Sequence, residues 1–219
     1  MITFEHVLSN QTIRTYINES DNALRQLGFT DHGPEHTTKV ANGAAYILKT
    51  LGYPVKDIEL AKISGYMHDI GNLVNRTGHS QSGAVMAFRL LSELGMPAED
   101  IAVVISAIGN HDEGTGVPVN AVAAALILAD KSDVRRCRVR NCDKSTFDIH
   151  DRVNYSVEEA VITINNDKTN ITLQLAVDKS YGSVMDYFEI FLKRMIMCRH
   201  AAKYLNMEFK LVINGQCLI

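Results

Sequence analysis

The sequence lacks the features that mark several large protein classes. It has no run of about 18 consecutive apolar residues, the length that a membrane-spanning helix requires. The opening segment MITFEHVLSNQTIR has no basic stretch followed by an apolar core, so we expect no secretory signal. Internal repeats and low-complexity segments are also absent. The sequence therefore predicts a globular protein of the cytoplasm, with no membrane partner.

The net charge and the cysteine spacing also exclude certain partners and sites. The net charge is −3 at pH 7, and this balance gives no reason to expect a nucleic-acid polymer as a partner. The four cysteines form no C-x-x-C pair and are too far apart for a zinc knuckle. We interpret them as reduced thiols with packing roles; they are Cys137, Cys142, Cys198 and Cys217.

The first 150 residues have the periodicity of packed helices. Apolar residues recur at intervals of three and four, as in the segment 40–51. Gly52 and Gly95 stand where a glycine ends a helix, and a proline follows each of them two positions later. The segment 121–130 is almost entirely apolar, which predicts a central buried helix. We expect a mainly α fold, with a helical bundle as the domain of residues 1–150.

The remaining residues, 151–219, have a different pattern. Apolar and polar residues alternate in 171–177, with 157–164 as the expected partner strand, and alternation returns in 207–213. Between them, 184–205 has helical spacing, and its apolar face needs a partner surface within the chain or across a homodimer. We therefore predict a small C-terminal α+β appendage, ordered strand-strand-helix-strand and of unknown role.

Side chains that bind metal ions follow the helical segments in order. Four imidazoles and two carboxylates are placed where burial without a partner would be costly. Fe, Mn, Zn, Co and Ni accept such mixed ligands, and Mg is a further candidate. The six candidate ligands are His36, His68, Asp69, His79, His111 and Asp130.

The adjacent pair His68-Asp69 sets how these ligands share ions. Neighbours on a helix point about 100° apart, so the two side chains cannot chelate like residues one turn apart. They can flank one ion, or bind one ion and bridge to a second. With ligands arriving from other helices, the set predicts one or two divalent ions inside a bundle.

Cationic residues follow Asp130 directly. Arginine offers a planar fork that suits phosphate, and we predict Lys131, Arg135 and Arg136 as substrate-binding residues. Arg138 and Arg140 are more consistent with structural roles. His32 lies one helical turn before His36, but Gly33-Pro34 argues against a continuous helix there, so we do not include it. The histidines without partners at ligand spacing are assigned no function; they are His6, His150 and His200.

The order of these residues and the segment HDIGN resemble the HD-domain superfamily of metal-dependent phosphohydrolases, over roughly residues 30–140. A more distant likeness is to the HD-GYP subfamily, which hydrolyses cyclic dinucleotides. That subfamily has a lysine where this chain has Asn72, and a double histidine where it has Asn110-His111. Its Gly-x-Gly-Tyr-Pro loop corresponds here to 114–118, with the sequence GTGVP.

The resemblance implies hydrolysis of a phosphoester by metal-activated water, with His68 and Asp69 as the catalytic pair. A bound ion lowers the pKa of its water to about 7, which supplies a nucleophile at neutral pH. The expected substrate is a small phosphorylated molecule, a nucleotide in the first place. Two alternatives stay open, namely a cyclic or dinucleotide phosphodiesterase, and a regulatory module that retains the metal site to sense a nucleotide.

Overall fold

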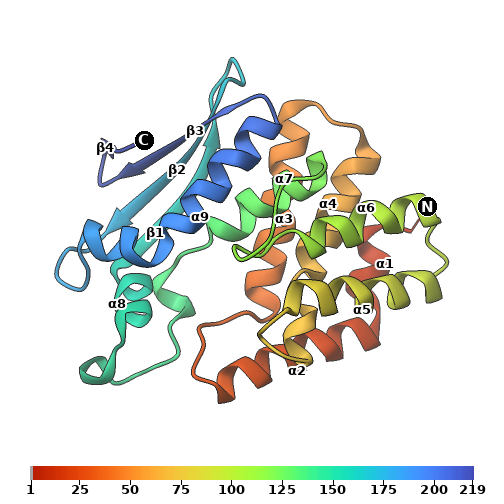
Figure 1. Cartoon of the computed structure of the whole chain (residues 1–219), viewed down its shortest axis with the longest axis horizontal. Coiled ribbons are helices and arrows are strands. Elements are labelled where there is room, and N and C mark those ends of the chain that lie inside the picture. Colours follow the sequence, from red (N-terminus) through yellow and green to blue (C-terminus); the bar gives the residue numbers. More distant parts are fainter. Residues whose placement is uncertain (1) are drawn as a thin grey trace.

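A computed structural model describes residues 2–219 of the chain. A helical part is followed by a smaller part in which one long helix lies against a four-stranded sheet (Figure 1). The predicted fold class, a mainly α bundle with a small α+β appendage, is confirmed. Within residues 2–219, no helix combines the length and the apolar character that crossing a membrane would take.

Seven α-helices and one 3-10 turn build the helical part. They are α1 (Phe4–Ser9), α2 (Gln11–Gln26), α3 (Pro34–Leu51), α4 (Val55–Met67), η1 (Ile70–Leu73), α5 (His79–Glu93), α6 (Ala98–Gly109) and α7 (Ala121–Lys131). A connecting segment follows, with the short turns η2 (Arg136–Arg138) and η3 (Lys144–Thr146). The chain then forms α8 (Ile149–Ser156), β1 (Val157–Ile164), β2 (Asn170–Val177), α9 (Val184–Tyr204), β3 (Glu208–Ile213) and β4 (Gln216–Cys217).

Local sequence explains where the main helices begin and end. Helix α3 begins with Pro34, whose fixed φ suits the first helical position, and is followed by Gly52 in the left-handed region at φ +86°. Helix α7 follows Asn120, whose side chain accepts a hydrogen bond from the backbone N–H of Ala123. Helix α9 begins with a capping box between Ser183 and Asp186.

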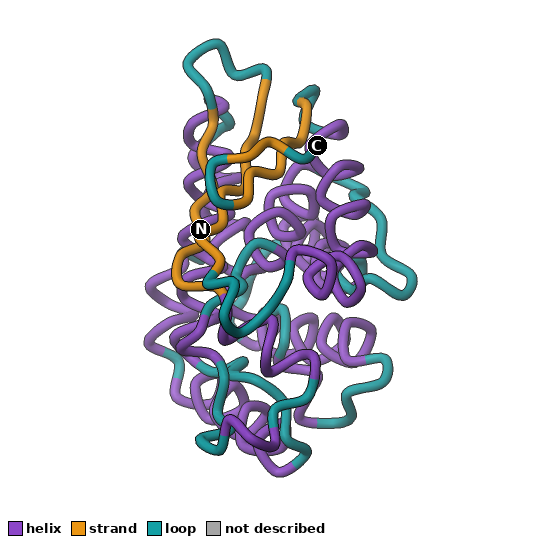
Figure 2. The backbone as a smooth tube through the Cα atoms, turned by 90° about the vertical axis from the view of Figure 1, so that its left-hand side faces the viewer, coloured by secondary structure: helices purple, strands orange, loops and turns teal. Residues whose placement is uncertain are grey.

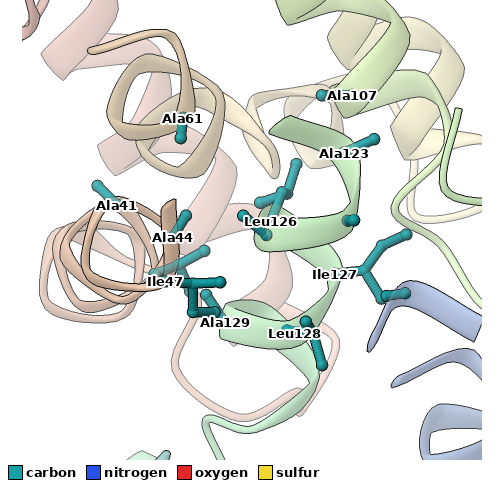
Figure 3. Packing of buried hydrophobic residues seen from close by; sticks show 14 of the residues in the cluster. Ala41, Ala44, Ile47, Ala61, Ala107, Ala123, Leu126, Ile127, Leu128 and Ala129 are labelled. Carbon is teal, nitrogen blue, oxygen red and sulfur yellow. The ribbon is translucent and has the colours of Figure 1, made fainter. Parts of the chain in front are cut away.

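Helix α7 is the centre of the core, as the apolar run 121–130 predicts. Leu126 and Ala129 pack among α3 and α4, while Ile127 points toward the side on which α9 lies (Figure 3). Small side chains at several buried positions of α3 and α4, such as Ala41, Ala44 and Ala61, let the three helices approach closely. The closest approach is at Gly65 of α4, where an added Cβ would lie 2.7 Å from the Cα and N atoms of Ala41. A side chain larger than hydrogen does not fit there.

The C-terminal part forms a sheet in the order β1-β2-β3-β4. Strands β1 and β2 are antiparallel, β2 and β3 are parallel, and β3 and β4 are antiparallel, so α9 is the crossover between β2 and β3. The predicted order strand-strand-helix-strand is correct, and the short β4 follows it. Figure 2 shows the strands gathered at one end of the molecule.

The two parts share one hydrophobic core. It is continuous from Phe4 in α1 to Ile213 in β3, and the predicted boundary at residue 150 falls inside α8. Helix α9 covers its apolar face within the chain, because it packs on both α7 and β3. The exposed fraction of Tyr187 is 1% and that of Phe191 is 2%.

Buried ion pairs also join α9 to the helical part. The carboxylate of Glu113, in the loop between α6 and α7, lies 2.6 Å from Nε of Arg194 and 3.3 Å from Nζ of Lys131. Burial raises the pKa of Glu113, but the charges of Lys131 and Arg194 outweigh it and lower that pKa to about 2. Glu113 is therefore ionised throughout the physiological range.

We predict that Gly65→Ala destabilises the protein, because the new methyl group would force α3 and α4 apart. The expected loss in the free energy of unfolding is about 1–3 kcal/mol, measured by urea denaturation followed by circular dichroism. Gly109→Ala is the matched control, since its Cβ would meet only Ala84 at 3.7 Å and alanine favours the helix. Equal stability of the two variants would contradict the predicted clash.

Glu113 also predicts a pH dependence of stability. Its pKa is lower in the folded protein than in the unfolded chain, so its contribution is complete above about pH 4.5 and is lost as the pH falls toward about 2. Glu113→Gln should lower the free energy of unfolding by up to about 3 kcal/mol at pH 7. The difference from wild type should shrink between pH 4.5 and 3 in urea titrations. Glu189→Gln, an exposed change on α9, should show no such trend; a pH-independent difference for Glu113→Gln would refute the linkage.

Candidate metal centre

The structure brings the six predicted metal ligands together at the ends of five helices. His36 is in the first turn of α3, and His79 is the first residue of α5. His68-Asp69 directly follows α4, His111 follows α6, and Asp130 is the next-to-last residue of α7. All six are buried, with exposed fractions between 0% for His36 and 9% for Asp130.

Each of the four imidazoles has its Nδ1 atom held by an oxygen atom. Because the partner is a carbonyl or carboxylate oxygen, Nδ1 carries the proton and Nε2 offers a lone pair. Three of these oxygens are backbone carbonyls close to the ends of α4, α5 and α6. The bonds run from His36 to Asp133 Oδ2 at 2.8 Å, from His68 to Gly65 O at 2.8 Å, from His79 to Arg76 O at 3.0 Å, and from His111 to Ile108 O at 2.6 Å.

The Nε2 atoms converge on the two carboxylates. Asp69 Oδ2 lies 3.1 Å from His68 Nε2 and 3.8 Å from His36 Nε2. The other oxygen, Asp69 Oδ1, lies 3.4 Å from His79 Nε2 and 3.8 Å from His111 Nε2. Asp69 therefore faces a different pair of imidazoles with each oxygen, which is the arrangement of a carboxylate that bridges two ions.

Asp130 completes the first of these two groups. Its Oδ1 lies 3.4 Å from His36 Nε2 and 3.6 Å from His68 Nε2. Ligand atoms of His36, His68 and Asp130 all lie within 4.8 Å of one another, and so do those of His68, Asp69 and His111. Two overlapping sets thus offer enough nitrogen and oxygen ligands for one or two ions.

The polar atoms of this cluster fit a bound cation. Nε2 of His36 and Nε2 of His68 are buried and have no hydrogen-bond partner among the described residues. Nε2 of His79 lies 3.1 Å from Nε2 of His111, although both nitrogens present lone pairs once their Nδ1 atoms donate elsewhere. Two facing lone pairs repel each other unless a positive charge lies next to both. The donor set is one that first-row divalent metals accept.

The titration behaviour of the cluster agrees with this charge requirement. Burial lowers the pKa of His68, but the charges of Asp69 and Asp130 outweigh it and raise that pKa to about 10. Burial raises the pKa of Asp69, yet His68 and His111 hold it well below its ordinary value. Burial lowers the pKa of His79 to about 4, so its imidazole is neutral at pH 7. The ionised carboxylates attract a cation, and without a metal that cation is the proton on His68.

A cavity of about 350 Å³ adjoins the cluster. The ring of His32 on its wall lies edge-on to the ring of His36, with 5.6 Å between the centroids. Nη1 of Arg76, also on the wall, lies 4.0 Å from Asp69 Oδ1. Arg138 is a third wall residue. The side of the cavity nearest the cluster is therefore cationic.

The three predicted substrate-binding residues are placed differently from one another. Lys131 is at the cluster, with Nζ 2.7 Å from Asp130 Oδ2. Arg135 is instead held by Asp133, through Nε at 2.6 Å and Nη2 at 3.1 Å. Arg136 donates to the carbonyl of Tyr155 at 2.6 Å, at the junction with the C-terminal part. The structure does not bring Arg135 or Arg136 to the cavity, because the chain leaves the helical path after Lys131.

Other residues near the cluster do not stand out in the sequence. His32 was excluded because Gly33-Pro34 interrupts the helix, yet the extended backbone before α3 places its ring beside His36. Asp133 follows Asp130 by three positions, which is the one available sign that its carboxylate faces the same side. Distant parts of the chain contribute the remaining basic residues of the cavity wall, which are Arg76, Arg138, His150 and Arg194.

Comparisons with known proteins agree with this arrangement. Residues 34–140 match the family model of the HD domain. An uncharacterised protein of Methanocaldococcus jannaschii is 28% identical over 189 residues, which cover 75% of this chain and 72% of that protein. Ribonuclease Y 1 of Pediococcus pentosaceus is 34% identical over 100 residues, which cover 44% of this chain and 17% of the ribonuclease.

Among solved structures, the crystal structure of a predicted HD superfamily hydrolase from an uncultured Thermotogales bacterium matches with a TM-score of 0.46. It is 24% identical, and the match covers 57% of this chain and 68% of that one. The segment matched by the family model contains all six ligands of the cluster, from His36 to Asp130. Residues 34–140 of this chain therefore form an HD domain, the domain of the metal-dependent phosphohydrolases that its sequence resembles.

Proposed function

We propose that this protein hydrolyses a phosphoester of a small molecule, with a mononucleotide as the expected substrate. The observation that carries the proposal is the convergence of four imidazole Nε2 atoms on Asp69 and Asp130 beside a cationic cavity. A divalent ion bound there supplies an activated water at neutral pH and a positive charge for phosphoryl oxygens. Family membership and the metal-ligand geometry both support phosphoester hydrolysis.

The protein's own residues have distinct roles in this proposal. His36, His68 and Asp130 hold one side of the metal centre, His79 and His111 hold the other, and Asp69 joins the two. Asp133 accepts the Nδ1 proton of His36 and so keeps its Nε2 free to bind. These anchored side chains need little rearrangement when metal binds.

The cationic wall is suited to the phosphate. Arg138 is buried and donates to the backbone carbonyls of Asp31 and Asp133, which fixes its guanidinium at the cavity. Arg76 is tied to Asn72 at 3.1 Å. Positive charges held in a partly desolvated site stabilise the developing charge of phosphoryl transfer.

The size of the cavity bears on the substrate. A volume of about 350 Å³ is near the lower end of the range of about 300–1,000 Å³ for small-molecule sites. That volume favours one nucleotide-sized molecule over a cyclic dinucleotide, and Asn72 in place of the subfamily lysine agrees with it. The alternative of a metal-retaining nucleotide sensor makes a different prediction, namely binding without turnover.

Metal loading and turnover test the proposal together. Purified protein should bind one to two equivalents of divalent metal, measured by elemental analysis. It should release phosphate from nucleoside monophosphates and p-nitrophenyl phosphate. A cyclic dinucleotide and a short RNA, whose hydrolysis yields phosphomonoester products, test the phosphodiesterase alternative. His68→Ala and Asp69→Ala should lose metal and reduce kcat by at least about 1,000-fold, because the activated water is lost. Chelation should abolish activity and lower Tm, and metal should restore both.

A matched control for these changes is His200→Ala, which alters an exposed histidine on α9 and should leave metal content and kcat unchanged. Metal bound at full stoichiometry with no turnover of any substrate would overturn the proposed hydrolysis and favour the sensor. Less than one equivalent of metal in protein that was never exposed to chelator would refute the metal centre.

Asp133 yields a separate prediction. Asp133→Asn replaces the acceptor of the His36 Nδ1 proton with an amide that can turn its N–H toward the ring, so the orientation of His36 is weakened. The affinity for metal should fall about 10–100-fold, measured by competition with a chromophoric chelator. Arg135→Gln removes a neighbour of Asp133 without touching His36, and it should change the affinity by less than threefold. Similar losses in both variants would assign the effect to the ion-pair network rather than to His36.

A further inference from the structure

The walls of the cavity and the metal ligands come from different parts of the chain. All six ligands lie within residues 34–140, the segment that matches the HD domain. Of the residues that line the cavity, only Arg76 and Arg138 lie in that segment. The others come from residues 27–32, between α2 and α3, and from α8 and α9 with the residue before α8. The C-terminal part thus forms much of the space beside the metal centre.

Among these wall residues, Arg194 of α9 has a guanidinium group that its neighbours hold at the cavity. Its Nε atom is 2.6 Å from the carboxylate of Glu113, and its guanidinium lies over the ring of Phe191 with 4.5 Å from Cζ to the centroid. The ion pair is made through Nε, and no hydrogen bond from its two Nη groups is found among residues 2–219. The guanidinium is therefore held by one edge and one face. It lines the cavity together with two other arginines, Arg76 and Arg138, and two carboxylates, Asp148 and Asp151.

Glu113 fixes this arginine relative to the metal centre. The same carboxylate oxygen lies 3.3 Å from Nζ of Lys131, and that ammonium lies 2.7 Å from Oδ2 of Asp130. A continuous row of alternating charges therefore runs from α9 to a metal ligand. Lys131 and the Oε1 atom of Glu113 are buried, although the Glu113 side chain as a whole is 18% exposed, so the centre of this row is shielded from solvent.

We propose that Arg194 is a phosphate-binding residue of the active site, so the C-terminal part completes the substrate chamber instead of forming a separate module. The inference rests on the proposed phosphoester hydrolysis. The planar fork of a guanidinium binds two phosphate oxygens at once, which the point charge of a lysine cannot do. Arg194 takes the role that the sequence assigns to Arg135 and Arg136, whose donors are occupied elsewhere.

The test compares Arg194→Gln with Arg199→Gln, which removes the same side chain from an exposed position of the same helix. Both variants are made in the full chain and loaded with metal. Binding of inorganic phosphate is measured by calorimetry, and KM and kcat are measured with p-nitrophenyl phosphate. Arg194→Gln should raise the phosphate Kd and the KM about 10–100-fold. Arg199→Gln should leave both constants within twofold of wild type.

Arg194→Lys separates phosphate binding from packing. It keeps the positive charge but loses the fork, so its phosphate Kd should lie between those of wild type and Arg194→Gln. If Arg194→Gln fails to fold, as judged by circular dichroism and Tm, the lysine variant carries the test. If Arg194→Gln and Arg194→Lys fold and bind phosphate with the wild-type Kd, the inference is wrong.

The outcomes also separate this inference from the proposed function. Turnover by wild type with unchanged KM in Arg194→Gln would refute the role of Arg194 while phosphoester hydrolysis stands. Weakened phosphate binding in Arg194→Gln, in a protein that hydrolyses no phosphoester, would support the phosphate site while hydrolysis fails. If metal-loaded wild type binds no measurable phosphate, the proposed phosphate site at Arg194 is refuted.

Discussion

The close approach of four imidazoles to two buried carboxylates is the constraint on which the rest of the structure depends. The lone pairs of His79 and His111 face each other at 3.1 Å, and those of His36 and His68 are buried without partners. Such a cluster is stable only with a cation inside it. The remainder of the fold can be understood as the framework that holds these groups at this distance.

That framework relies on helix ends more than on helix faces. Three of the four histidines donate their Nδ1 protons to backbone carbonyls close to the points where helices begin or end, so the helix ends themselves orient the ligands. Gly65 has two functions in this arrangement. It lets α4 pass close to α3, and its carbonyl accepts the proton of His68. The crossing of these helices and the position of the ligands are therefore one structural feature.

The structure brings together the six residues that the sequence analysis selects as ligands, because local chemistry marks them. His68-Asp69 ends a buried apolar helix, and Asp130 ends another, so each is conspicuous without any knowledge of the fold. Arg135 and Arg136 were predicted only because they follow Asp130 closely, and that nearness does not bring them to the cavity, because α7 ends at Lys131. The sequence analysis also misses Arg194, which lies 81 positions after Glu113 in the sequence, and no local pattern indicates that the two side chains meet.

The fold shows the same limit of local reasoning. Alternation in 157–164 and 171–177 identifies two strands, and helical spacing identifies α9, because each pattern reports which side chains are buried. The pattern does not identify the elements against which these side chains pack. Phe191 is covered within the chain, on the side of α9 that also presents Arg194 to the cavity. The apolar face that docks α9 and the basic residue that lines the cavity are thus parts of one packing arrangement.

This arrangement has a consequence for how specificity can vary. The ligands of the metal centre are confined to 34–140 and are constrained by every neighbour that holds an Nδ1 proton. The chamber walls come largely from residues 27–32, α8 and α9, which contact the cluster through single side chains such as His32 and, by way of Glu113, Arg194. Substitutions in these flanking elements can therefore reshape the substrate space without disturbing the ligands. The candidate metal ligands lie in the helical part, and most of the cavity wall comes from the elements that surround it.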